Sequence, residues 1–314
     1  MTAATERDLS TVQPSPPAGT IVVGIDGSES SKRAAAWAAV QAAAEGRGLT
    51  LAHAILPPDS AWIDYAPMSE HGFDRVRTEA EEMLAEARSV VSRYAGRAVI
   101  HEYTRVADPR DLLLDLAEGA AEVVVGSRGR GPVRSLLLGS VGVTLTRHTP
   151  CPVVVHRPGS EGRVHTSIIA GVDGTARSRV VLEYAFAQAS MRGLPLTVVH
   201  CIWDAQAATV GPAVMAGAGA AAVFVGEAEE SVESARLLVS EAIAGLCEDH
   251  PDVPVRTELA RGLAADALVR MSDRADLVVV GSHHGGVASS ILLGSVATDV
   301  VEHARCPVAI VPVD

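Results

Sequence analysis

The sequence VVVGSRGRGPVRSLLLGSVGVTLTRHTPCPVVV, residues 123–155, joins an apolar run to a glycine-containing segment, a helical pattern that opens at Gly-Ser, and a second apolar run. Residues 278–310 repeat this order as VVVGSHHGGVASSILLGSVATDVVEHARCPVAI. In both stretches two Gly-Ser pairs lie thirteen positions apart, beginning at 126 and 139 in the first and at 281 and 294 in the second. This recurrence indicates a repeated structural unit.

The repeat extends over nearly the whole chain. GIDGSESSKRAAAWAAVQAAAEGRGLTLAHAI (24–55) corresponds to GVDGTARSRVVLEYAFAQASMRGLPLTVVHCI (171–202) at an offset of 147. The offset is 155 at the glycine segments, so the second copy holds eight additional residues. A period of this length indicates a duplicated domain. We expect a disordered tail at 1–18, a first domain at 19–157, a linker at 158–166 and a second domain at 167–314.

Short β-branched runs alternate with helical patterns in each copy. In the first copy, strands are expected near 20–25, 49–56, 98–105, 122–126 and 152–156, and helices near 29–46, 70–94, 108–118 and 139–148. This alternation predicts an α/β fold of two similar doubly wound domains, each an open five-stranded parallel sheet flanked by helices. Ligands of such sheets bind at the carboxyl ends of the strands, near the switch point. The apolar closing strands are expected at sheet edges and to join the two halves.

The composition narrows the possible classes of function. A net charge of −12 and a pI near 5.4 disfavour nucleic-acid binding. The four cysteines show no metal-ligand spacing, and without a secretory signal we expect a cytoplasmic protein with reduced thiols. The uncharged stretch 205–226 is long enough to span a membrane, but its Ala and Gly content and Pro212 favour a flexible loop.

The glycine segments have the features of a phosphate-binding loop. Gly126 ends a strand and Gly139 precedes a helix, whose first backbone N–H groups are unpaired and favour anions. Gly129 between them allows close approach of a phosphate. Ser140 is expected either to cap the helix or to donate to a phosphate oxygen. The alternative is that Gly129 only makes a turn and Ser140 only caps.

Motifs for rapid phosphoryl transfer do not occur in the chain. Neither G-x-G-x-x-G after the first strand nor G-x-x-x-x-G-K-[ST] is found, and Lys32, the only lysine, lies away from the glycine segments. The sequence therefore predicts a site that holds a nucleotide without cleaving it quickly.

The pattern G-x-x-G-(nine residues)-G-S, met as Gly126, Gly129, Gly139 and Ser140, resembles the ATP-binding signature of universal stress proteins. GIDGSESS and LAHAI resemble the first two strands of that family. The resemblance covers the chain twice after the tail and is that of a tandem-type universal stress protein. It implies an ATP-binding regulator of stress response or growth arrest, with Mg²⁺ as a companion of the phosphates left open. A slow ATPase and a nucleotide-free interaction module are the alternatives.

The resemblance also implies which residues surround the nucleotide. Asp26 is assigned to the ribose and adenine side, with an N-cap role as the alternative, and Ala54 to backbone contacts with adenine. The expected set in the first copy is Asp26, Ala54, Gly126, Ser127, Gly129, Gly139, Ser140 and Val141. The corresponding set in the second copy is Asp173, Cys201, Gly281, Ser282, Gly294, Ser295 and Val296.

The second copy departs from the family pattern at one position. His284 replaces the second motif glycine, and a Cβ there is expected to crowd the phosphates unless Gly285 and Gly286 restore the approach. His283 and His284 are expected to be polar loop residues, with phosphate or metal binding as the alternative.

Other chemically suggestive residues have simpler interpretations. His53 and His200 end equivalent strands without a nucleophile placed beside them, so structural roles are expected. Packing explains Cys151 and Cys306, and no disulfide is expected between them. Arg128 is expected either near phosphate or in solvent. No catalytic residue is assigned. Beside adenine nucleotide, the expected partners are an unidentified regulatory protein and a second copy of the chain.

Overall fold

The computed structural model describes residues 15–56, 70–128, 138–157, 166–202, 218–283 and 294–313, with only the backbone described for 70–74, 218–231 and 283. The predicted tail up to residue 14 and most of the predicted linker, 158–165, lie outside these ranges. The division into domains therefore stays a prediction.

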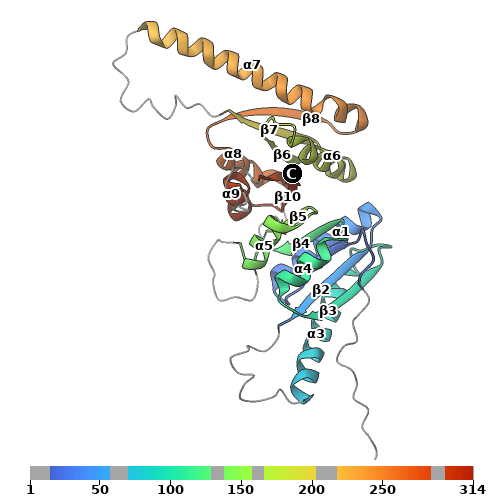
Figure 1. The fold of residues 1–314 in the computed structure, drawn as a ribbon. Helices are drawn as coiled ribbons and strands as arrows, with labels where there is room; N and C mark the ends of the chain where they lie inside the picture. The colour runs from blue at the N-terminus through green and yellow to red at the C-terminus, as the bar shows by residue number, and fades with distance from the viewer. Residues whose placement is uncertain are drawn as a thin grey trace, which may run out of the picture.

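Strands and helices alternate in both halves (Figure 1). The first half contains β1 (Ile21–Gly24), α1 (Glu29–Glu45), β2 (Leu49–Ile55), α3 (Glu70–Val91), β3 (Ile100–Val106), α4 (Pro109–Ala117), β4 (Glu122–Gly126), α5 (Ser140–His148) and β5 (Val153–His156). The second contains β6 (Ser167–Val172), α6 (Ser178–Arg192), β7 (Leu196–Ile202), α7 (Ala218–Asp249), β8 (Val255–Arg261), α8 (Ala264–Met271), the 3₁₀ turn η1 (Ser272–Arg274), β9 (Ala275–His283), α9 (Ser295–His303) and β10 (Val308–Val313).

The described strands form one ten-stranded sheet in the order β3-β2-β1-β4-β5-β10-β9-β6-β7-β8. Neighbours are parallel within each half, and the halves meet where β5 and β10 pair antiparallel, with Val154 opposite Ala309. The predicted α/β fold and the joining of the closing strands are confirmed. The two five-stranded sheets, however, form a single continuous sheet. In each half the strand order reverses beside the first strand, between β1 and β4 and between β6 and β9.

Each face of the sheet carries one apolar core that runs through both halves. One core packs α1, α3, α6 and α7 against the sheet, and it includes Leu84, Phe186 and Val239. The other packs α4, α5, α8 and α9, and it includes Leu145 and Val300. Because both faces are covered, the strands consist of continuous apolar runs such as IVVG in β1.

Two sequence expectations are wrong. The helix expected near 70–94 ends at Val91, and Tyr94, beyond its end, is 49% exposed. Residues 218–226, expected to be loop, form the first part of α7. Alanine is the residue with the highest helix propensity, so this Ala-rich segment forms helix without the apolar periodicity used to find one. Residues 203–217 lie outside the described residues.

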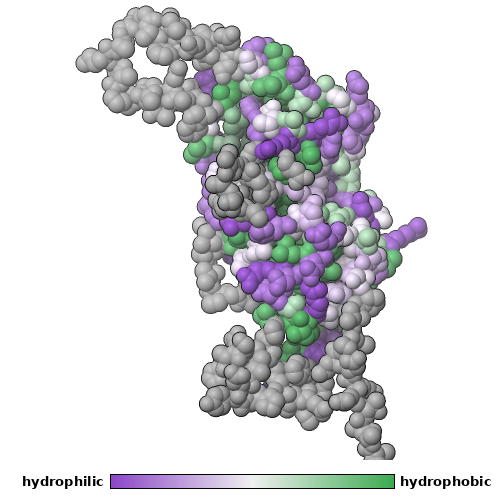
Figure 2. All heavy atoms as spheres, in the orientation of Figure 1, coloured by the Kyte–Doolittle hydropathy of each residue, from purple (hydrophilic) through white to green (hydrophobic). Residues whose placement is uncertain are grey.

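No described helix is long and apolar enough to cross a membrane. In the view of Figure 2, hydrophilic and hydrophobic side chains are interspersed over the described surface.

A polar cluster joins α1 and α6 at the junction of the halves. Arg192 donates to Gln41 Oε1 at 2.5 Å and forms an ion pair with Asp276 at 2.8 Å, and its guanidinium lies 5.1 Å from the centre of the Trp37 ring. Gln188 of α6 donates to Glu45 Oε1 of α1 at 3.4 Å. These bonds link side chains that are far apart in the sequence across the β5–β10 seam.

A buried carboxyl group lies at the same junction. Tyr184 of α6 donates its hydroxyl to Glu122 Oε2 at the start of β4. Glu122 is 2% exposed, and burial raises the pKa of its carboxyl to about 8. At the opposite end of the seam, Arg157 donates to the carbonyl of Val301 in α9 at 2.8 Å.

Candidate functional site

A pocket of about 470 Å³ opens at the carboxyl ends of the first-half strands. It lies where the strand order reverses, between the ends of β1 and β4, with α4 and the start of α5 as its other walls. The lining residues are Gly24, Ile25, Asp26, Ser31, Ala52, Ala54, Pro109, Leu112, Leu113, Val125, Gly126, Arg128, Leu138, Gly139, Ser140, Val141 and Gly142. A doubly wound sheet places its ligands at this point.

The pocket brings together most residues predicted for the first site. Asp26, Ala54, Gly126, Gly139, Ser140 and Val141 all line it. Ser127 does not line it but lies directly after Gly126, is 1% exposed, and its Oγ has no hydrogen-bond partner among the described residues. Gly129 lies outside the described residues.

Two of the glycines have different physical reasons to be glycine. A Cβ on Gly126 would lie 2.6 Å from Ser30 Oγ and 2.8 Å from the backbone carbon of Ser30, so close packing of β4 against α1 requires glycine there. A Cβ on Gly139 would meet nothing within 4 Å among the described residues, and its φ of −61° suits any amino acid. Neither its φ nor packing against the described residues requires glycine at 139, and the space left open beside it among those residues allows close approach of a ligand.

The start of α5 faces this open space with backbone donors that no side chain of the described residues caps. Gly139 is the N-cap residue and no side chain accepts from the first turn. Ser140 is exposed and holds the first helical position, so it does not cap α5. Gly139, Ser140 and Val141 thus place an uncapped helix N-terminus at the pocket, an arrangement that favours anions.

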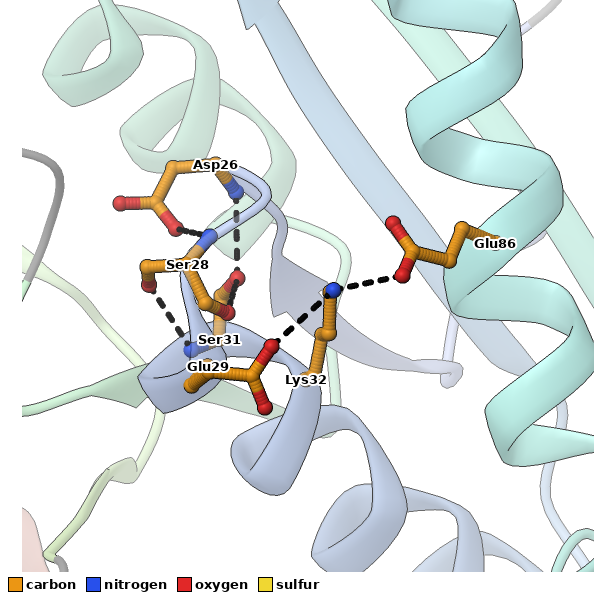
Figure 3. A network of polar contacts seen from close by, with 6 residues as sticks. All are labelled: Asp26, Ser28, Glu29, Ser31, Lys32 and Glu86. Carbon is orange, nitrogen blue, oxygen red and sulfur yellow. Dashed lines mark hydrogen bonds and ion pairs between the residues drawn. The ribbon is translucent and has the colours of Figure 1, made fainter.

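Asp26 holds the turn between β1 and α1 (Figure 3). Its Oδ1 accepts from the backbone N–H of Ser28 at 3.0 Å. Ser28, not Asp26, is the N-cap of α1 and accepts from Ser31 N at 3.1 Å. Asp26 Oδ2 has no donor among the described residues and belongs to a pocket-lining residue, so this oxygen is available to a ligand.

Lys32 is turned away from the pocket. Its Nζ lies 2.6 Å from Glu86 of α3 and 3.1 Å from Glu29, on the side of α1 opposite the Asp26 carboxylate (Figure 3). The only lysine of the chain is therefore engaged in ion pairs outside the site.

The second half contains an equivalent pocket of about 350 Å³. It is lined by Gly171, Val172, Asp173, Arg177, Ser178, Val181, Val199, Cys201, Ala264, Leu268, Val280, Gly281, Gly294, Ser295, Val296, Ala297 and Val313. All residues predicted for the second site line it except Ser282, which is 3% exposed beside Gly281. His284 and the two glycines after it lie outside the described residues.

The carboxylate of the second pocket is engaged by its own loop. Asp173 Oδ1 accepts from Thr175 N at 2.9 Å, from Thr175 Oγ1 at 2.8 Å and from Ser178 Oγ at 2.7 Å. In the first pocket the equivalent of Ser178 is Ser31, which donates to the backbone oxygen of Ser28 instead. The two aspartates thus occupy equivalent positions with different hydrogen bonding.

Comparison with known proteins agrees with this architecture. The Universal stress protein family matches residues 18–157 and again 165–312. The chain belongs to the universal stress protein family. A universal stress protein of Mycolicibacterium smegmatis is 33% identical over 298 residues, which cover 93% of this chain and 96% of that one. One from Mycobacterium tuberculosis is 33% identical over 299 residues, covering 92% and 96%.

A solved structure shares the tandem fold. The crystal structure of a universal stress protein from Archaeoglobus fulgidus has a TM-score of 0.64, with 19% identity over 95% of this chain and 97% of that one. The present chain is thus a universal stress protein of the tandem type.

The histidines of this universal stress protein have structural partners. His53 Nδ1 lies 2.7 Å from the carbonyl of Ile25, and His200 Nδ1 lies 3.1 Å from that of Val172. Both rings tie the second strand of their half to the end of the first, as expected from the sequence. The four cysteines are free thiols. No group of three or more metal-ligating side chains occurs among the described residues.

Sequence reasoning missed one wall of each pocket. Leu112 and Leu113 of α4 line the first pocket, and Leu268 of α8 lines the second. The sequence could have indicated the leucines of the first pocket. The helix expected near 108–118 follows a strand at the carboxyl edge of the sheet, so its apolar face must cover β1 and β4. Arg177, which lines the second pocket, takes the position of Ser30 in the first half, and no motif marked it.

Proposed function

We propose that this universal stress protein binds ATP at the carboxyl ends of its strands and is a cytoplasmic, nucleotide-dependent regulator of stress response or growth arrest, without fast hydrolysis. The observation that carries the proposal is Gly139, an N-cap glycine that neither its φ nor packing against the described residues requires. It lines a pocket at the start of α5, whose first turn has no described side-chain cap. A phosphate in this open space would accept from the N–H groups of Ser140 and Val141. Beside it, Asp26 Oδ2 would accept from the nucleoside.

The residues of the first pocket suit binding of ATP better than hydrolysis of ATP. Lys32 pairs with Glu29 and Glu86, outside the pocket. His53 is bound to a backbone carbonyl. Arg128 is then the cation among the described lining residues of the first pocket, and it serves phosphate charge rather than proton transfer. This arrangement supports storage of the nucleotide and disfavours the ATPase alternative.

The test is isothermal titration calorimetry of the full chain with ATP. Gly139→Glu fills the open space with a side chain of the wrong charge and is expected to remove binding at the first pocket. Gly245→Glu in α7 is the matched control, since a Cβ there also meets nothing within 4 Å and the residue does not line either pocket. Equal ATP binding by both variants would contradict the proposal, and rapid release of ADP would favour the ATPase.

A regulatory protein partner and a homodimer of the whole chain are part of the same proposal. Light scattering of the full chain with and without ATP tests the dimer. A monomer mass under both conditions would remove it from the proposal.

A further inference from the structure

The two pockets differ most at the turn that follows the first strand of each half. In the first half, the Asp26 carboxylate accepts one described hydrogen bond, from Ser28 N to Oδ1, and Oδ2 has no described donor. The Asp26 backbone N donates to Ser31 Oγ at 3.4 Å. The turn needs no more, because Ser28 caps α1 with its own hydroxyl.

In the second half, residues of the turn hydrogen-bond to the carboxylate of Asp173. α6 begins only at Ser178, and its N-cap, Arg177, makes no side-chain cap bond. Thr175 and Ser178 both direct their hydroxyl groups to Asp173 Oδ1, which also accepts from Thr175 N. Three donors on Asp173 Oδ1 fix the orientation of the carboxylate and satisfy part of its charge, so one further donor gains less there than at Asp26, whose carboxylate has one described donor.

The walls of the second pocket also change on the base side. Val199 and Cys201 stand where the first half has Ala52 and Ala54. The pocket volume falls from about 470 Å³ to about 350 Å³. The helix N-terminus at Ser295 is retained and Arg177 adds a guanidinium to the lining, so the features that suit an anion remain.

We propose that the two pockets differ in their selectivity for nucleotides. The first selects for a nucleoside donor, a sugar hydroxyl or the adenine amine, through Asp26. The second is a phosphate-directed pocket that accepts compact phosphorylated ligands without selecting for either donor, because Thr175 and Ser178 hold Asp173. This inference rests on the proposed function, and it makes Thr175 and Ser178 the residues that set the selectivity.

The experiment isolates each pocket in the full chain. Gly139→Glu leaves the second pocket open and Gly294→Glu leaves the first. Each variant is titrated with ATP, with 2′,3′-dideoxy-ATP, which lacks the sugar hydroxyls, and with inosine triphosphate, which lacks the adenine amine. With the first pocket open, at least one analogue is expected to bind about tenfold or more weakly than ATP, the effect of losing a hydrogen bond to a charged group. With the second open, both analogues are expected to bind within about threefold of ATP.

The loop is tested by a matched pair of variants. Thr175→Ala with Ser178→Ala, in the Gly139→Glu background, is expected to bring selectivity to the second pocket by releasing Asp173. Ser190→Ala, also in the Gly139→Glu background, removes a serine hydroxyl of α6 that donates to Asp252 and lines neither pocket, and it is expected to leave the second pocket unselective.

Each outcome has one meaning. Equal discrimination by the two pockets overturns this inference and leaves ATP binding intact. A second pocket that binds none of the three nucleotides also overturns it. If ATP binds to neither pocket of the unaltered chain, the proposed function fails and the inference fails with it.

Discussion

The two halves of the chain are most alike at the carboxyl ends of their strands and differ at the junction between them. At the pockets, the motif positions keep the same residue, as at Asp26 and Asp173 or Gly139 and Gly294, although other lining positions differ. At the junction they differ in charge, as at Glu45 and Arg192. Each pocket lies within one half, so its residues never meet their counterparts. Junction residues do meet them, because the seam between β5 and β10 places α1 against α6.

The charge difference at the junction distinguishes the tandem chain from a dimer of two identical domains. In a dimer of the first half, Glu45 would face a second Glu45 near two buried Glu122 side chains. In the tandem chain a cation takes one of these places, since Arg192 binds Gln41 and Asp276. The sequence differences at the junction are thus explained by pairing of unlike halves.

Reversing the charge of Arg192 is the strongest way to break the junction. Arg192→Glu removes the ion pair with Asp276 and the bond to Gln41, and brings a fourth carboxyl group beside Glu45 and Glu122. The free energy of unfolding is expected to fall by about 2–4 kcal/mol, because a partly buried cation with charge-assisted bonds becomes an anion among carboxyl groups. Urea denaturation measures the change.

The matched control lies on the same helix. Arg179 pairs with Glu183 at 2.8 Å while 73% exposed, so Arg179→Glu is expected to change stability by less than about 1 kcal/mol. Similar losses in the two variants would show that the junction cluster has no special weight.

Gly126, which ends β4, and its counterpart Gly281 within β9 give the next test, because both line the pockets. Gly126→Ala forces a methyl group into the backbone of Ser30 and is expected to cost about 1–3 kcal/mol. Gly281→Ala meets only methyl groups of Val181 and Val313 at 3.3 Å, which can move, so a smaller loss is expected. Thermal unfolding of both variants measures the difference, and a reversed order would contradict this account of the packing.

The buried carboxyl group of Glu122 predicts a pH dependence. Burial raises its pKa from 4.5 to about 8, so the folded state holds a proton that the unfolded state releases in this interval. The stability contributed by Glu122 is therefore full below about pH 4.5 and is lost as the pH rises to about 8. His156 acts in the opposite sense, since burial lowers its pKa from 6.5 to about 4, and stability from His156 rises over that range.

Above pH 6.5, Glu122 still changes the stability with pH, whereas His156 no longer does. Between pH 6.5 and 8, Glu122→Gln keeps an acceptor for Tyr184 and is expected to flatten the pH dependence by on the order of 1–2 kcal/mol. Urea denaturation at several pH values measures this, with the unaltered chain as reference. Parallel curves for the two proteins would show that Glu122 does not titrate in this range.

The sequence predicted the elements and the pockets because both depend on local patterns. Alternation of apolar runs and helical periods located the strands, and the paired Gly-Ser motifs located Gly139 and Gly294 at a strand-to-helix connection. Two properties were beyond such patterns. The bonds of Asp173 depend on where α6 begins, and the burial of Glu122 depends on Tyr184 from the other half. A period in the sequence shows which face is buried, but not which residue of another element lies against it.

The measurement that tests the central claim most directly is the amount of adenine nucleotide released when freshly purified protein is denatured. It is made on the unaltered chain and on Gly139→Glu, with urea unfolding of both. The account predicts bound ATP in the unaltered chain and about one nucleotide less per chain in the variant. After the nucleotide is removed, the two proteins are expected to have the same unfolding midpoint. Protein without nucleotide, and without thermal stabilisation by added ATP, would contradict it and leave the interaction module as the better explanation.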